Sequence, residues 1–114
     1  MLAEQFKYRR APSVPRRITE IAPEKDIRVR ILGRVIDKSD GMLIVDDGSS
    51  SAEIIVDSSD VARTGDVVRV FTRVLPLESG YELRGEVVQV MNDLDLNVLR
   101  KIELMSNLGI RVGE

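Results

Sequence analysis

The chain has 114 residues, 43% of them hydrophobic, and a formal net charge of -2, which predicts one domain with a core that needs no covalent staple. It contains no cysteine and no histidine, which excludes disulfides, thiol chemistry, histidine metal sites and Ser-His or Cys-His catalysis. No apolar run approaches the roughly 20 residues of a membrane span, and the amino terminus lacks the apolar region of a secretory signal. We therefore expect a cytoplasmic protein with no membrane partner. The overall charge gives no support for nucleic-acid binding.

Residues 1–23 are predicted to form a basic arm or strap. The first seventeen residues carry five basic side chains against the single acid Glu4, and three prolines within the arm prevent a long helix. The arm is either a solvated tail or a segment that contacts phosphate or a partner protein. Phe6 and Tyr8 lie among the basic residues and either stack on single-stranded nucleic acid or pack the arm onto the rest of the protein.

Residues 27–56 are predicted to form three strands joined by two turns. Apolar Ile27, Val29 and Ile31 alternate with arginines, which is typical of a strand with one buried face and one wet face. Gly33 interrupts this strand, which indicates a bend where one strand serves two parts of a curved sheet. Glycine-containing turns then lead to strands over residues 42–45 and 52–56.

The remaining strands complete a recognisable order. Ser58 or Ser59 is expected to cap a short helical turn, and two segments with strong β-forming composition follow over residues 67–75 and 81–90. Five strands with a helical insertion between the third and the fourth is the order of a Greek-key barrel of the oligonucleotide/oligosaccharide-binding (OB) type. The predicted fold class is all-β with a C-terminal helix: a five-stranded Greek-key OB-fold barrel over residues 24–91.

Three segments carry a family resemblance. Residues 33–36, 43–48 and 52–56, with the Ala11-Pro12 lead-in, resemble the small OB-fold subunits of replication protein A and the archaeal replication-protein-A-associated proteins. The resemblance extends over about residues 11–105. It implies single-stranded DNA binding, or assembly into a complex that binds single-stranded DNA. OB barrels also occur in tRNA-binding, ribosomal and telomere-capping proteins.

A helix is expected over residues 92–109. Asn92 or Asp93 is suited to cap its start, and Gly109 is suited to end it. Residues at helical spacing form an apolar stripe, which either closes the barrel end or meets a partner helix. In the resembled family a C-terminal helix joins subunit bundles, so the resemblance implies protein subunits as partners. The stripe consists of Val98, Leu99, Ile102 and Met105.

The candidate nucleic-acid-binding residues lie on the expected wet faces of three strands. Arginines there would contact phosphate and one tyrosine would stack a base; alternatively, the arginines only solubilise a barrel wall. The chain has few aromatic residues, so it is expected to bind single-stranded DNA weakly on its own. Five acids would repel phosphate if they share that face: Glu53, Asp57, Glu78, Glu82 and Glu86. The candidates are Arg28, Arg30, Arg34, Arg69, Arg73, Tyr81 and Arg84.

No enzymatic reading fits the sequence. Asp46 and Asp47 are adjacent, so in a strand they point to opposite faces, and before Gly48 they read as a turn. We expect no catalytic residues, metal or cofactor. The leading hypothesis is a single-stranded-DNA-binding or assembly subunit of a replication-protein-A-like complex acting in DNA replication, repair or recombination. The alternatives are a protein–protein interaction module built on an OB barrel and an RNA-binding OB domain.

Overall fold

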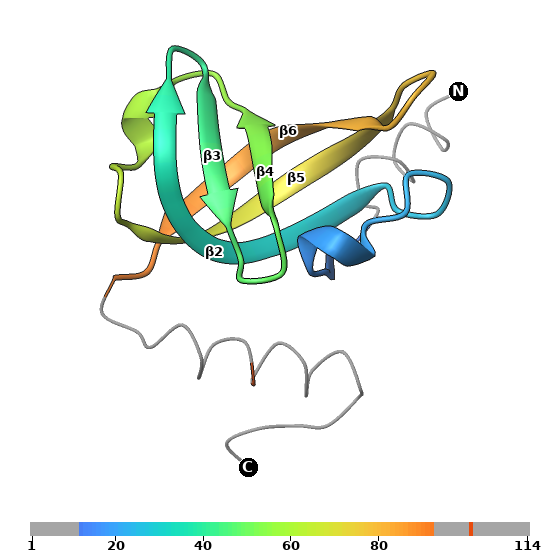
Figure 1. Ribbon diagram of the computed structural model, residues 1–114, viewed down its shortest axis with the longest axis horizontal. Coiled ribbons are helices and arrows are strands. Elements are labelled where there is room, and N and C mark those ends of the chain that lie inside the picture. Colours follow the sequence, from blue (N-terminus) through green and yellow to red (C-terminus); the bar gives the residue numbers. More distant parts are fainter. Residues whose placement is uncertain (1–11, 93–100, 102–114) are drawn as a thin grey trace.

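The structure is a computed structural model, and it describes residues 12–92 and Lys101. Five long strands wrap into a closed barrel, with a two-residue strand and two short 3-10 turns at its edges (Figure 1). In chain order the elements are β1 (Val14–Pro15), η1 (Ile18–Glu20), β2 (Arg28–Ser39), β3 (Met42–Asp46), β4 (Ser51–Ile55), η2 (Ser59–Val61), β5 (Val67–Pro76) and β6 (Tyr81–Val90).

The barrel closes in the order β2-β3-β4-β6-β5 and back to β2. The neighbouring strands are antiparallel except for β4 and β6, which are parallel and pair at Ile54–Leu83 and Ile55–Arg84. This is the strand order of a five-stranded OB barrel. The predicted Greek-key barrel is therefore confirmed. β1 adds to the edge of β2 as a short parallel partner.

Gly33 lies where β2 passes from one side of the barrel to the other. The first half of β2 pairs with β5 up to Arg34, and the second half pairs with β3 from Arg34 onward. A Cβ atom on residue 33 would lie 2.5 Å from the carbonyl oxygen of Asp46 on β3. The bend predicted from this glycine is thus confirmed. Glycine is required there because the backbones of β2 and β3 approach each other closely.

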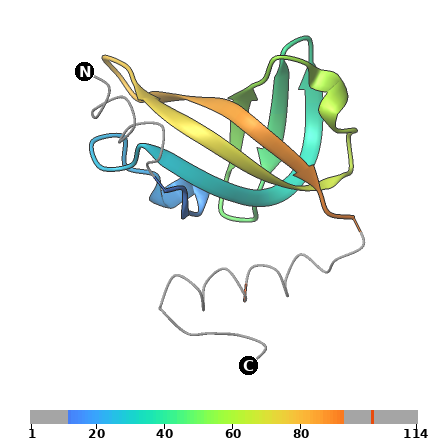
Figure 2. The ribbon, with the colours of Figure 1, turned by 180° about the vertical axis from the view of Figure 1, so that it is seen from behind.

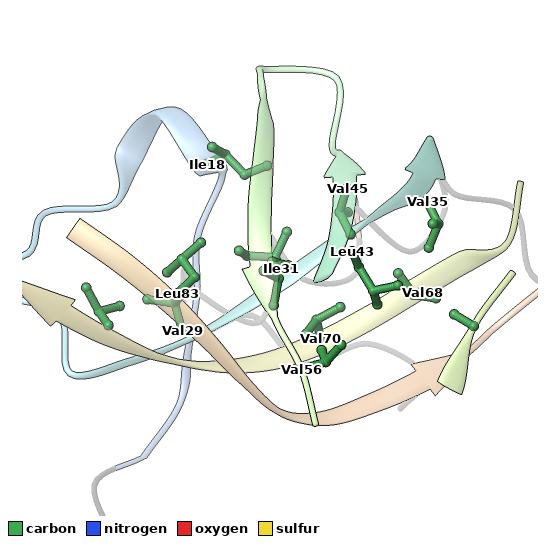
Figure 3. Packing of buried hydrophobic residues seen from close by; sticks show 13 residues of the cluster. Ile18, Val29, Ile31, Val35, Leu43, Val45, Val56, Val68, Val70 and Leu83 are labelled. Carbon is green, nitrogen blue, oxygen red and sulfur yellow. The ribbon is translucent and has the colours of Figure 1, made fainter. Parts of the chain in front are cut away.

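The inner side of the barrel is filled by aliphatic side chains from every long strand (Figure 3). Residues such as Val29, Ile31 and Leu43 have no exposed surface, as the alternating pattern requires. Ile18 reaches into this core from η1, so the segment before β2 plugs one mouth of the barrel. Ala62, which follows η2, is buried in the same core.

The helical insertion between the third and fourth long strands is η2. The Ser58 hydroxyl oxygen accepts a hydrogen bond from the Asp60 amide at 3.2 Å, which is the predicted cap. The Lys38 ammonium group of β2 donates to the carbonyl oxygens of Ser59 and Ala62 at 3.3 and 3.2 Å. These bonds fix η2 across the barrel end.

The predicted fold class was wrong in one element. The described residues form an all-β barrel whose helical pieces are two 3-10 turns of three residues each, and no C-terminal helix belongs to it. Apart from Asn92 and Lys101, the helix expected over residues 92–109 lies outside the described residues, as does its stripe. Helical spacing reports only a local tendency, whereas tertiary packing decides whether a helix belongs to a fold.

Asn92, the first residue of the expected helix, is described and contacts the barrel. Asn92 completes the barrel: its side-chain oxygen accepts from the Val67 amide at 2.7 Å, and its side-chain nitrogen donates to Asp66 at 2.8 Å. Within the described part of the chain, no helix has the length and apolar character needed to cross a membrane.

Candidate nucleic-acid interface

Six of the seven predicted binding residues share one side of the barrel. β2, β5 and β6 lie side by side, with β5 between the other two strands (Figure 2). Along each strand these arginines alternate with buried residues such as Val29, Val70 and Leu83, so they point outward. We call this surface the arginine wall. It consists of Arg28, Arg30, Arg34, Arg69, Arg73 and Arg84.

Three of these arginines form a row across the strands. Arg28 of β2 lies opposite Arg73 of β5, which lies opposite Arg84 of β6. Like charges directly opposite one another in a sheet are destabilising, so this row needs counter-charge. Glu82 and Glu86, two of the five acids expected to repel phosphate on this face, provide part of that counter-charge.

Glutamates pair with the two ends of the row. The Glu86 carboxylate lies 3.1 Å from Arg28 Nε, and the Glu82 carboxylate lies 2.9 Å from Arg84 Nε. Arg73, between them, is exposed and makes no ion pair with the described residues. Arg73 is therefore the arginine of the row whose positive charge is least compensated by nearby carboxylates.

Two other arginines of the wall are tied to the protein backbone. Arg30 donates to the carbonyl oxygen of Ser13 at 2.8 Å and to its hydroxyl at 3.0 Å, which fastens β1 to β2. Arg34 donates to the carbonyl oxygen of Gly65 at 2.7 Å. These guanidinium groups hold structure together, and such bonds leave other N–H groups of an arginine for further contacts.

Tyr81 does not lie on the arginine wall. It begins β6 and packs against the hydrophobic core, on the opposite face of the strand from Glu82 and Arg84. Its partial burial raises the pKa of the phenol. The predicted stacking platform is thus separated from the predicted phosphate contacts.

Tyr81 lines a groove instead. β4 and β6 touch at Ile54 and Ile55 and then diverge, which leaves a groove of about 530 Å³ closed at its base by η1. Its apolar lining includes Met42, Ile55, Leu77 and Tyr81. Glu53 and Glu82 also line it, and no basic side chain does among the described residues.

This groove occupies the position where OB barrels bind ligands, near the sheet of the second and third strands and the loop between the fourth and fifth. Proteins that bind single-stranded nucleic acid use a positively charged groove. The described lining of this groove has no positive charge, because the arginines lie on the arginine wall instead. Apart from Tyr81, the groove residues were not among the sites predicted from the sequence. Their signal was present: Met42 and Ile55 are apolar at the outward positions of β3 and β4.

Asp46 ends β3 and Asp47 begins the turn that leads to β4, so the turn predicted before Gly48 starts one residue later than Asp46. Gly48 adopts a φ of 92°, and the Asp46 carboxylate accepts from the Gly48 amide at 2.7 Å. Asp47 is buried and accepts from the amides of Ile18 and Ser49. Within the described ranges, no cluster of three acidic residues is placed to hold a metal ion.

Solved structures of other proteins share this barrel. The telomere capping protein Ten1 from Saccharomyces pombe is 22% identical with a TM-score of 0.68, over 85% of this chain and 99% of that chain. The S. pombe Stn1–Ten1 complex gives 19% identity and a TM-score of 0.65, over 85% and 93%. Replication protein A from U. maydis, bound to single-stranded DNA, gives 18% and 0.65, over 85% and 91%.

These similarities show the fold. The resemblance to small OB-fold subunits of replication protein A is confirmed at that level. No family model and no curated protein matches the chain. Of these proteins, Ten1 is a telomere capping protein, Stn1 and Ten1 form a complex, and the replication protein A is bound to single-stranded DNA.

Proposed function

We propose that the chain is an OB-fold subunit of a complex that binds single-stranded DNA in replication, repair or recombination, and that it contributes phosphate contacts through the arginine wall. The observation that carries this proposal is the row of Arg28, Arg73 and Arg84 across three adjacent strands. Such a row is destabilising by itself, and an array of phosphates offsets it. Proteins with this barrel include replication protein A bound to single-stranded DNA.

The wall supports backbone contact more than base recognition. Phe71 is the one aromatic residue on the described outer faces of β2, β5 and β6, and base stacking on aromatic rings supplies most sequence-tolerant affinity in single-strand binding, about 1–3 kcal/mol per base. We therefore expect weak, strongly salt-dependent binding by the isolated chain. A stable position on DNA then depends on the other subunits of the complex.

An Arg73→Ala substitution is expected to weaken binding of the full chain to fluorescein-labelled oligo-dT by about threefold to tenfold at low salt. Loss of one phosphate contact should lower the slope of log affinity against log salt by about 0.7. Fluorescence anisotropy at several salt concentrations measures both quantities. Arg73 suits this test because its removal leaves no described carboxylate unpaired.

Arg63→Ala is the matched control, since Arg63 is exposed in the turn before β5 and lies off the wall. It should leave the salt slope unchanged. Absence of oligo-dT binding at low salt, or equal effects of the two substitutions, would refute the role of the wall. If oligo-U displaces oligo-dT at lower concentration than unlabelled oligo-dT does, RNA is the ligand of this surface, because the 2′-hydroxyl distinguishes the two.

A further inference from the structure

The groove beside β4 contains a strand edge without a described partner. β4 pairs with β3 along its whole length but with β6 only at Ile54 and Ile55. Within the part of the chain that the structure describes, the edge of residues 51–53 that faces the groove therefore has no neighbouring strand. An open strand edge is a template for another strand.

The hydrogen-bond pattern of the β3–β4 hairpin shows which groups face the groove. The Val56 amide donates to the Gly41 carbonyl at 3.0 Å, and the Asp47 amide donates to the Ser50 carbonyl at 3.2 Å. In an antiparallel pair such bonds recur at every second residue, so even-numbered residues of β4 bond to β3. The N–H groups of Ser51 and Glu53 and the Ser51 carbonyl therefore point toward the groove. The parallel pairing of Ile54 with Leu83 uses the Glu53 carbonyl, and the Ser51 carbonyl accepts from the Ser50 hydroxyl at 3.5 Å.

The side chains around this edge are apolar and acidic. Met42, Ile55 and Leu77 give the groove apolar surface, and the Leu77 side chain is 55% exposed. The Glu53 carboxylate is exposed at the rim, and Glu82 lines the groove while pairing with Arg84. The Glu53 carboxylate has no cation among the described lining residues, so it disfavours a phosphate chain in the groove and favours a cationic ligand.

We propose that this groove binds an extended segment of a partner protein, which adds as a strand to the open edge of β4 and carries apolar residues alternating with lysine or arginine. Main-chain hydrogen bonds to Ser51 and Glu53 give affinity in this mode, and side chains at every second position give specificity. Apolar side chains pack on the groove and the basic ones meet Glu53. The inference deepens the proposed function, on which it rests, by naming the partner chemistry of an assembly subunit.

The test uses the full chain and a short fluorescein-labelled peptide of alternating valine and lysine. Ser51→Pro removes the amide that faces the groove without removing a bond to β3, since proline is tolerated where its missing N–H is not part of a ladder. We expect Ser51→Pro to weaken peptide binding about threefold to tenfold, the effect of one hydrogen bond. Ser51→Ala, which keeps the amide, should bind like the parent chain.

Charge is tested separately. Glu53→Lys is expected to weaken binding of the same peptide about tenfold, whereas Glu24→Lys, at an exposed residue outside the groove, should change it less than twofold. Hydrogen exchange of the Ser51 and Glu53 amides should slow when the peptide is added. Thermal melts establish that Ser51→Pro and Glu53→Lys remain folded.

Three results would overturn the proposal: no peptide binding, equal binding by Ser51→Pro and Ser51→Ala, or displacement of the peptide by oligo-dT together with loss of oligo-dT binding in Ser51→Pro. The last result would make the groove a nucleic-acid site. The two surfaces are tested independently, because Arg73→Ala should keep peptide affinity and Ser51→Pro should keep DNA affinity. A failed peptide experiment is thus distinguishable from a failed role of the arginine wall.

Discussion

A Gly33→Ala substitution is expected to lower the free energy of unfolding by about 3 kcal/mol, the upper range for overpacking a well-packed site. The added Cβ would lie 2.5 Å from the Asp46 carbonyl oxygen and 2.8 Å from Cγ1 of Val45. The oxygen belongs to the backbone of β3, which is held in the barrel by pairing on both sides, so it cannot move aside at low cost. Urea denaturation of the parent chain and the variant measures the difference.

Gly80→Ala is the control for the cost of losing a glycine. Gly80 has a φ of 81°, and a Cβ there would meet nothing within 4 Å. Only backbone strain applies, and it should cost about 1–2 kcal/mol. Equal losses from the two substitutions would show that steric contact with β3 is not what requires Gly33.

An Asp47→Ala substitution is expected to lower the free energy of unfolding by about 2–4 kcal/mol, because it leaves buried donors without an acceptor. The Asp47 side chain is 4% exposed and accepts from the Ile18 amide at 2.7 Å, the Ser49 amide and hydroxyl at 2.8 and 2.6 Å, and the Ser50 amide at 3.2 Å. Asp46→Ala removes one bond at a half-buried neighbour and should cost about 1 kcal/mol. Similar losses at both positions would contradict the role assigned to Asp47.

The same carboxyl predicts a dependence of stability on acid. Burial by itself raises the pKa of Asp47, but the hydrogen bonds from Ser49, Ile18 and Ser50 outweigh it and hold the pKa below 3.8. Because the pKa is lower in the folded state, this stabilisation is present above the unfolded value and is lost as pH falls through the folded value. Asp47→Asn should therefore flatten the loss of unfolding free energy between about pH 5 and about pH 2, as measured by urea denaturation.

The barrel was predictable because its signals are local. Alternation along residues 28–34 and the β-forming composition of residues 67–75 mark strands wherever they lie, and Gly33 marks a bend because no other residue fits there. The convergence of the arginines follows from alternation once the strand order is known. Their function could not be predicted from the sequence, because an arginine on a solvent-exposed face can either bind a ligand or only keep the protein soluble.

The apolar outward residues Met42 and Ile55 were visible in the sequence, but the position of the groove and of Tyr81 could not be predicted from local signals. Their arrangement depends on the parallel contact of Ile54 with Leu83, two residues far apart in the chain, and on the divergence of β4 and β6 beyond it. The predicted C-terminal helix shows the opposite difficulty. Its apolar spacing was clear, yet spacing alone does not tell whether the fold offers a surface against which such a helix can pack.

The shared strand β2 has a consequence for how the protein folds. Its first half pairs with β5 and its second half pairs with β3, so neither pairing can open without exposing core residues that the other covers. We therefore expect one all-or-none transition, with calorimetric and van't Hoff enthalpies that agree. Most pairings that close the barrel join distant parts of the chain, and such topologies fold in milliseconds to seconds.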